Sequence, residues 1–194
     1  MRVSCAIVAL LLGVSGARAA ADNAQMLPKA ASLPVALDPS FQFRKTKIYA
    51  LEPQLPKAMV RARAATNVSA TSSTKSTTST AVTQEQSLLF EHSYRLFGAV
   101  TAFDQRQRFG EYFDFFWRSK WPSNVRVRFE YKQEKLRALV QAKEITYTNA
   151  RGTCHSEFRV IGDEFANDGK VMAWRCLLLA RGRIVAEKRS FLWD

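Results

Sequence analysis

Cys154 and His155 have the residue types of a cysteine nucleophile and its base, because a neighbouring imidazole can activate a thiol. Residues 153–161, however, alternate with the period of two that predicts a β-strand. Adjacent residues of a strand point to opposite faces, so the thiol and the imidazole cannot meet. The only other histidine is His92, and no histidine or cysteine spacing is typical of zinc. We therefore predict no catalytic residue, no metal and no cofactor.

Carboxylates gather in the segment 162–169, which reads GDEFANDG. Closely spaced oxygen ligands can hold calcium, but this spacing differs from that of an EF-hand loop. Asp and Asn beside glycines are also typical of turns, and we favour that interpretation. The chain has no glycine-rich phosphate loop and no Gly-x-Ser-x-Gly elbow. We therefore expect no enzymatic activity and no small-molecule substrate.

Cys154 and Cys176 are a candidate disulfide pair. If strands 153–161 and 170–180 form a hairpin, position 154 lies opposite position 177, one place from Cys176. If the strands lie in facing sheets, the two thiols could meet across the core. The alternative is two buried free thiols, which are common small core residues. We predict the disulfide because the N-terminus indicates an oxidising compartment.

Residues 1–19 have the pattern of a secretory signal peptide. Arg2 supplies a positive start, residues 6–16 form an apolar core, and residues 17–19 read ARA, a small-x-small cleavage motif. This core is too short to anchor the chain in a bilayer, which needs about 20 apolar residues. We expect a secreted, periplasmic or cell-envelope protein with no transmembrane segment after cleavage.

Residues 20–65 hold five of the chain's six prolines and show no sustained period, which predicts a poorly ordered arm. An apolar cluster within it, at 41–51, is an alternative edge strand or docking segment. Residues 66–83 contain 12 Ser or Thr and bury too little apolar surface to offset the entropy of ordering. They are predicted to be a linker. Residues 84–97 are left open as an entry segment or a helical turn.

Residues 98–194 have the composition of an all-β domain, since aromatic and β-branched runs alternate with glycines. The clearest strand is 125–131, VRVRFEY, whose apolar and charged residues alternate. Arg181-Gly182 indicates a hairpin turn, and Trp174 and Cys176 are expected to face the core. Residues 134–143 have a helical alternative. Seven strands are expected, at 94–103, 111–119, 125–131, 138–148, 153–161, 170–180 and 183–192.

Seven short strands in about 100 residues are typical of an immunoglobulin-like or fibronectin type III sandwich. FFW at 115–117, then Trp121-Pro122, then VRVRFEYKQ at 125–133 resembles the second and third strands of fibronectin type III domains. Asp168-Gly169 resembles the entry to their penultimate strand, although Trp174 stands where these domains carry a tyrosine.

The end of the chain, from AWR at 173–175 to SFLW at 190–193, is similar to that of small secreted bacterial proteins. Together these resemblances imply a seven-stranded antiparallel sandwich over residues 98–194. They imply little about function, because sandwiches host many unrelated roles.

Arg126, Arg128 and Arg175 form the candidate binding face. In a sandwich of this topology their strands share a sheet, so the three side chains could lie together beside Phe116. The alternative is the ordinary charged outer face of an antiparallel sheet. The net charge of +12 favours anionic partners. We expect a non-enzymatic exported module that binds a protein or polymer, or alternatively a basic envelope protein that binds polyanions such as lipopolysaccharide, wall polymer or nucleic acid.

Overall fold

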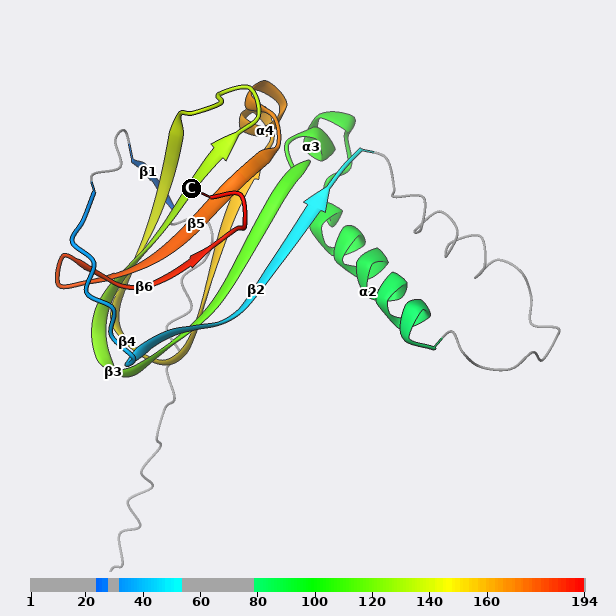
Figure 1. Cartoon of the computed structure of the whole chain (residues 1–194). Coiled ribbons are helices and arrows are strands. Elements are labelled where there is room, and N and C mark those ends of the chain that lie inside the picture. Colours follow the sequence, from blue (N-terminus) through cyan, green and yellow to red (C-terminus); the bar gives the residue numbers. More distant parts are fainter. Residues whose placement is uncertain (1–23, 28–31, 54–78, 194) are drawn as a thin grey trace, which may run out of the picture.

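The computed structural model describes residues 24–27, 32–53 and 79–193 (Figure 1). The predicted signal peptide at 1–19 and most of the predicted linker at 66–83 lie outside these residues. The elements are β1 (Gln25–Leu27), β2 (Phe41–Leu51), α2 (Ser79–Leu96), α3 (Ala102–Arg106), β3 (Gly110–Gln133), β4 (Val140–Ile161), α4 (Asp163–Asp168), β5 (Val171–Ala180) and β6 (Arg183–Arg189).

The described strands form one antiparallel sheet of six strands. Its order is β1-β4-β3-β5-β6, and β2 also pairs with β3. β2 pairs with the first part of β3 and β5 with the second part. The all-β, antiparallel prediction is confirmed at this level, but six strands replace the expected seven. One reason is that the strands expected at 111–119 and 125–131 are both parts of β3; β4 likewise contains the two expected at 138–148 and 153–161.

β3 doubles back on itself. The rings of Phe113 and Phe129, both on β3, have their centroids 4.7 Å apart. On a straight strand these two residues would lie about 50 Å apart. The pairing with β4 is irregular between Ser119 and Val125, and this is where both strands turn, near the β3 and β4 labels in Figure 1. The two halves of the β3–β4 hairpin therefore face each other across an aromatic core.

The core confirms the inward faces that the alternation predicts. Val125, Val127, Phe129 and Tyr131 are fully buried, and Trp174 and Cys176 lie in the same cluster. The aromatic rings that contact one another within this cluster include Phe113, Phe115, Phe129, Phe158 and Trp174.

Two aromatic residues of this core use their polar groups in hydrogen bonds, as burial favours. The indole Nε1 of Trp117 donates to Ser156 Oγ at 2.9 Å. The Tyr147 hydroxyl donates to the His155 carbonyl oxygen at 2.8 Å. Burial raises the pKa of Tyr147 to about 12.

The prediction of a poorly ordered arm at 20–65 is wrong for residues 41–51, which form β2. Phe41 and Leu51, at the two ends of β2, are buried. The prolines at 39 and 53 flank β2 and do not interrupt it, which is where a strand tolerates them. The domain therefore begins well before residue 98. The alternative of an edge strand at this position is the one that the structure shows.

The strand expected at 94–103 is absent, and the helical alternative for 84–97 is confirmed by α2. α3 begins with a capping box in which Thr101 and Asp104 bond each other's backbone amides. Those local bonds favour a helix over a strand at this point. No helix in the described part of the chain is long and apolar enough to cross a bilayer.

Arg95 of α2 joins the helix to the sheet. The Arg95 side chain is only 8% exposed and forms ion pairs with Glu91 at 2.7 Å and with Glu157 of β4 at 3.1 Å. Asp114 of β3 lies 3.6 Å from the same guanidinium group. The guanidinium carbon also lies 3.9 Å from the ring centroid of Tyr112. The C-terminal end of α2 therefore packs on the outer face of the first half of the β3–β4 hairpin.

Candidate functional site

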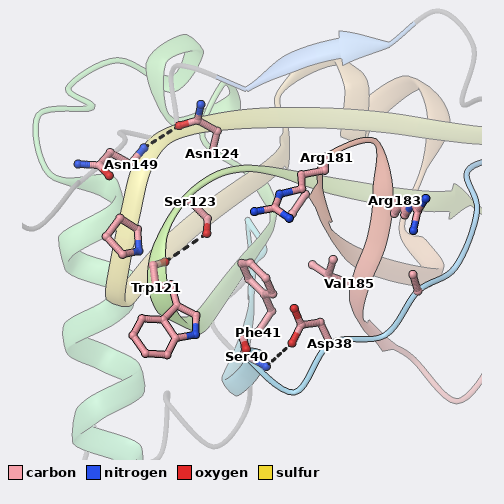
Figure 2. A pocket seen from close by; sticks show the side chains of 13 residues that line it. Asp38, Ser40, Phe41, Trp121, Ser123, Asn124, Asn149, Arg181, Arg183 and Val185 are labelled. Carbon is pink, nitrogen blue, oxygen red and sulfur yellow. Dashed lines mark hydrogen bonds between the residues drawn. The ribbon is translucent and has the colours of Figure 1, made fainter.

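A cavity of about 970 Å³ lies at the bent end of the sheet, and we call it the end pocket. Four separate segments meet there: the stretch before β2, the bend of β3, the middle of β4, and the β5–β6 turn. Figure 2 shows its labelled side chains around the space. The lining residues are Ala36, Asp38, Ser40, Phe41, Trp121, Pro122, Ser123, Asn124, Asn149, Ala180, Arg181, Arg183 and Val185.

Trp121 is held at the mouth of the end pocket by the irregular bend of β3. Its side chain is 67% exposed, which is unusual for a residue of this size. The hydroxyl of Ser119 donates to the Trp121 carbonyl oxygen at 2.6 Å. Pro122, which cannot donate to a sheet ladder, fits here because the regular pairing stops. The bend thus presents an indole to solvent.

The β5–β6 turn supplies two guanidinium groups. Arg181 and Gly182 have φ angles of 52° and 74°, and Ala180 pairs with Arg183. This is a two-residue hairpin turn of the type that needs positive φ at both positions, so the predicted turn is confirmed. Asn or Asp is the usual first residue of such turns, because ordinary side chains are strained there. Arg181 is therefore not the residue that the turn itself favours.

The amides of the end pocket come from the two paired strands β3 and β4. The Oδ1 atom of Asn124 accepts a hydrogen bond from the backbone amide of Asn149 at 2.9 Å (Figure 2). Asn149 has a φ of 54°, a conformation that asparagine tolerates better than most residues. This bond fixes the Asn124 side chain against the backbone of β4.

The charge of the end pocket is mixed but mainly positive. Asp38 is its carboxylate, and it accepts a hydrogen bond from the backbone amide of Ser40 at 2.8 Å. Hydrogen bonds from Ser40, aided by Lys120 and Arg181, lower the pKa of Asp38. Asp38 is therefore ionised at neutral pH, and it lines the end pocket together with the exposed Arg181 and Arg183.

No family model, no curated protein and no solved structure matches this chain. The end pocket must therefore be interpreted from its own residues.

The arginines of the predicted binding face are brought together, but as ion pairs. Arg128 lies 3.1 Å from Glu144 and 3.7 Å from Glu130, and Arg175 lies 2.6 Å from Glu130. Arg126 lies 3.8 Å from Glu144. Only Arg126 of the three has a largely exposed side chain, at 45%. Most of the positive charge on this face is thus balanced within the sheet.

Two other segments cover the same outer face. The Trp193 ring lies 5.0 Å from the guanidinium of Arg175 and from the ammonium of Lys132. Leu33 packs on the buried residues Leu177, Leu179 and Ile184. Phe116, expected beside the arginines, lies on the first half of β3 and stacks on His155. Because of this cover, the end pocket is the better candidate for a ligand site.

Cys154 and Cys176 are buried free thiols in the structure, and no disulfide joins them there. Cys154 lies opposite Trp117 of β3 and Cys176 lies opposite Phe129 of β3. They are therefore not neighbours in one hairpin. His155 points to the other face of β4 and bonds Asp114 at 2.7 Å, as the alternation predicts.

We expect both thiols to be unreactive in the folded protein, because burial raises the pKa of Cys154 and of Cys176 and excludes reagents. In protein lacking residues 1–19, a disulfide-exchange chromogen at pH 8 should react at least about tenfold more slowly before denaturation than after it. Denaturation without a reductant should release two thiols. A count of zero would restore the predicted disulfide.

The acidic segment 162–169 contains α4, and its main carboxylate is already engaged. Glu164 lies 2.6 Å from the ammonium of Lys143 and accepts a hydrogen bond from the Tyr131 hydroxyl. Lys143 also donates to the Arg159 carbonyl oxygen at 2.6 Å. Glu164 thus closes the end of the core opposite the bend, and its oxygens serve that packing.

The end pocket was missed from the sequence because it depends on the doubling back of β3. Trp121-Pro122 lies between two expected strands in the sequence, and Arg181-Gly182 indicates a turn. Nothing in their spacing indicates that they lie at one end of the molecule with residues 36–41. The signal that existed was local: an arginine in a turn that prefers asparagine.

Proposed function

We propose that this chain is an exported, non-enzymatic binding module and that its end pocket binds an acidic polysaccharide. The observation that carries the proposal is the exposed indole of Trp121 in one cavity with Arg181 and Arg183. An indole offers a flat apolar face for the carbon skeleton of a sugar ring. A guanidinium group forms strong, charge-assisted bonds with a carboxylate or sulfate.

The remaining lining residues suit the same ligand. Asn124, Asn149 and Ser123 offer donors and acceptors of the kind that bind sugar hydroxyls. The net charge of +12 would attract an anionic polymer and speed its association. The wide opening at an end of the molecule suits a chain that passes through more than it suits a small enclosed metabolite.

A binding role fits the end pocket better than a catalytic one. Its lining residues include no histidine and no cysteine, and Asp38 is held ionised by its bonds to Ser40. Acid–base chemistry would need a second group with a pKa near neutrality. Within the described residues no cluster of His, Cys, Asp and Glu suited to a metal occurs.

The export and the sandwich fold expected from the sequence are also part of this proposal. The protein would be exported by residues 1–19 and act outside the cell or in its envelope. Its sheet, folded around an aromatic core, would serve as an immunoglobulin- or fibronectin-like sandwich, with the segments at 32–53 built into it. Arg126 would add a second, weaker contact for a long anionic chain.

The test is Arg181→Asn, with polygalacturonate as the acidic probe and dextran as the neutral one. Because asparagine suits the turn better, the variant should unfold at an equal or higher temperature. Loss of a charge-assisted bond should weaken polygalacturonate binding about 10-fold in affinity electrophoresis. Dextran should not bind either protein.

Arg137→Asn is the matched control. Arg137 is also exposed, also has a positive φ (51°), and lies in the turn between β3 and β4, at the other end of the second half of β3. The control makes the same change of charge about 30 Å away along the strand. Equal weakening by both substitutions would assign binding to net charge alone, and failure of the native protein to bind polygalacturonate would exclude the acidic polysaccharide.

A further inference from the structure

The two helices before β3 carry several exposed apolar side chains. Phe90, Tyr94 and Phe97 follow the i, i+4, i+7 spacing that places them on one side of α2 and its end. Phe97 is 83% exposed and Phe103 of α3 is 68% exposed. We call these residues, with Leu88 and Val100, the aromatic surface: Leu88, Phe90, Tyr94, Phe97, Val100 and Phe103.

The aromatic surface is fixed in place from behind and is not a frayed end. Arg95 holds α2 to the sheet through Asp114 of β3, Glu157 of β4 and the ring of Tyr112. Arg108 donates to the carbonyl oxygens of Arg95 and Phe97, at 3.0 and 2.6 Å, which closes the end of α2. Figure 1 shows the end of α2 that precedes α3 close to the tip of the β2 arrow. A rigid exposed patch of this kind is typical of an interaction surface.

Charge identifies which partner suits the patch. Two nearby acidic side chains already have partners: Glu91 pairs with Arg95, and Asp104 accepts hydrogen bonds from Thr101. Exposed basic residues remain beside it: Arg106 on α3, and Lys45 and Lys47 on β2, which adjoins α2 through Tyr49 and Arg95. The net charge of +12 disfavours a second copy of this chain as the occupant. It favours an anionic surface.

We propose that the aromatic surface docks on an anionic lipid bilayer. Aromatic rings settle at the level of the headgroups, and basic residues beside them are attracted to anionic lipids. The α2–α3 face would lie flat on the membrane without spanning it. This site is separate from the end pocket and does not depend on its ligand.

The test is co-sedimentation of the full chain with vesicles of phosphatidylethanolamine and phosphatidylglycerol, and with vesicles of phosphatidylcholine alone, at 0.15 M salt. The native protein should bind the anionic vesicles at least about 10-fold more strongly than the neutral ones. The variant carrying Phe97→Ser and Phe103→Ser should lose at least about 10-fold in partition coefficient. Both residues are exposed, so the melting temperature should not fall.

Phe191→Ser is the matched control, because Phe191 is 98% exposed and lies next to the segment that covers the opposite outer face of the sheet through Trp193. It should bind vesicles as the native protein does. Equal binding by the double variant and the native protein would overturn the proposal, as would absence of vesicle binding. Self-association that the double variant abolishes, without vesicle binding, would assign the surface to a second copy instead.

Discussion

Phe129→Ala is expected to lower the free energy of unfolding by about 3–5 kcal/mol, the usual effect of removing a buried aromatic ring. Phe129 is fully buried and its ring lies within 4.7–5.7 Å of four others. Two of these, Phe113 and Phe115, belong to the opposite half of the doubled β3. The cavity would therefore open at the contact that keeps β3 folded on itself. Urea unfolding followed by tryptophan fluorescence measures the change.

Phe191→Ala makes the same change at a side chain that is 98% exposed, and it should alter stability by less than about 0.5 kcal/mol. A loss for Phe129→Ala below about 1 kcal/mol would contradict the packing of the two halves of β3 against each other. The comparison separates core packing from the general effect of losing a ring.

Arg95→Met is expected to destabilise the attachment of α2 by about 2–4 kcal/mol. Removing one partner of a buried ion pair usually costs 3–5 kcal/mol, because the other charge stays buried and uncompensated. Here part of that cost is avoided. Glu157 keeps Arg159 at 2.8 Å, and Asp114 keeps its bond to His155. Methionine retains the apolar contact with Tyr112, so the lost stability is due mainly to removal of the positive charge.

Amide hydrogen exchange is the measurement that shows where Arg95 acts. In the variant, protection should fall across α2 while the amides of β3 and β4 exchange as before, because the sheet keeps its own pairs. Arg106→Met, on the exposed side of α3, is the matched control and should leave α2 protected. Uniform loss of protection throughout the sheet would show that Arg95 supports the whole fold and not one helix.

Local patterns were sufficient to predict the centre of the sheet. Residues 125–131 alternate without interruption, and every apolar residue among them is buried. The β5–β6 turn is likewise encoded by two adjacent residues, Arg181 and Gly182. These elements were predictable because the period and the turn chemistry act over a few positions.

Elements that depend on distant partners were not predictable in this way. The five prolines of residues 20–65 indicate a poorly ordered arm, although β2 lies between two of them. β2 forms because it pairs with β3, for example Tyr49 with Tyr112. The bend at Trp121-Pro122 has the composition of a loop, but β4 runs beside it and keeps β3 continuous. The Thr101–Asp104 capping box is, by contrast, a local signal in the sequence for the start of a helix.

The candidate site also combines features that local sequence patterns predict with features that depend on distant segments. Arg126 and Arg128 lie on β3 and Arg175 on the paired strand β5, which brings the three arginines near one another. Glu130 and Glu144 form ion pairs with these arginines. The pairs depend on the register between neighbouring strands, which alternation within one strand does not predict. The end pocket needs the three-dimensional path of four segments, so no window of sequence contains it.

The pairing of β3 also has a consequence for the order in which the chain folds. Joining β3 to β4 closes only residues 133–139, next to the pair Lys132 and Val140, whereas joining β2 to β3 closes residues 52–109, next to the pair Leu51 and Gly110. The entropy of loop closure makes the second step more costly by about 2 kcal/mol. The β3–β4 hairpin is therefore the natural folding nucleus, and β2 completes the sheet late. Until that step, the edge of β3 that receives β2 stays open.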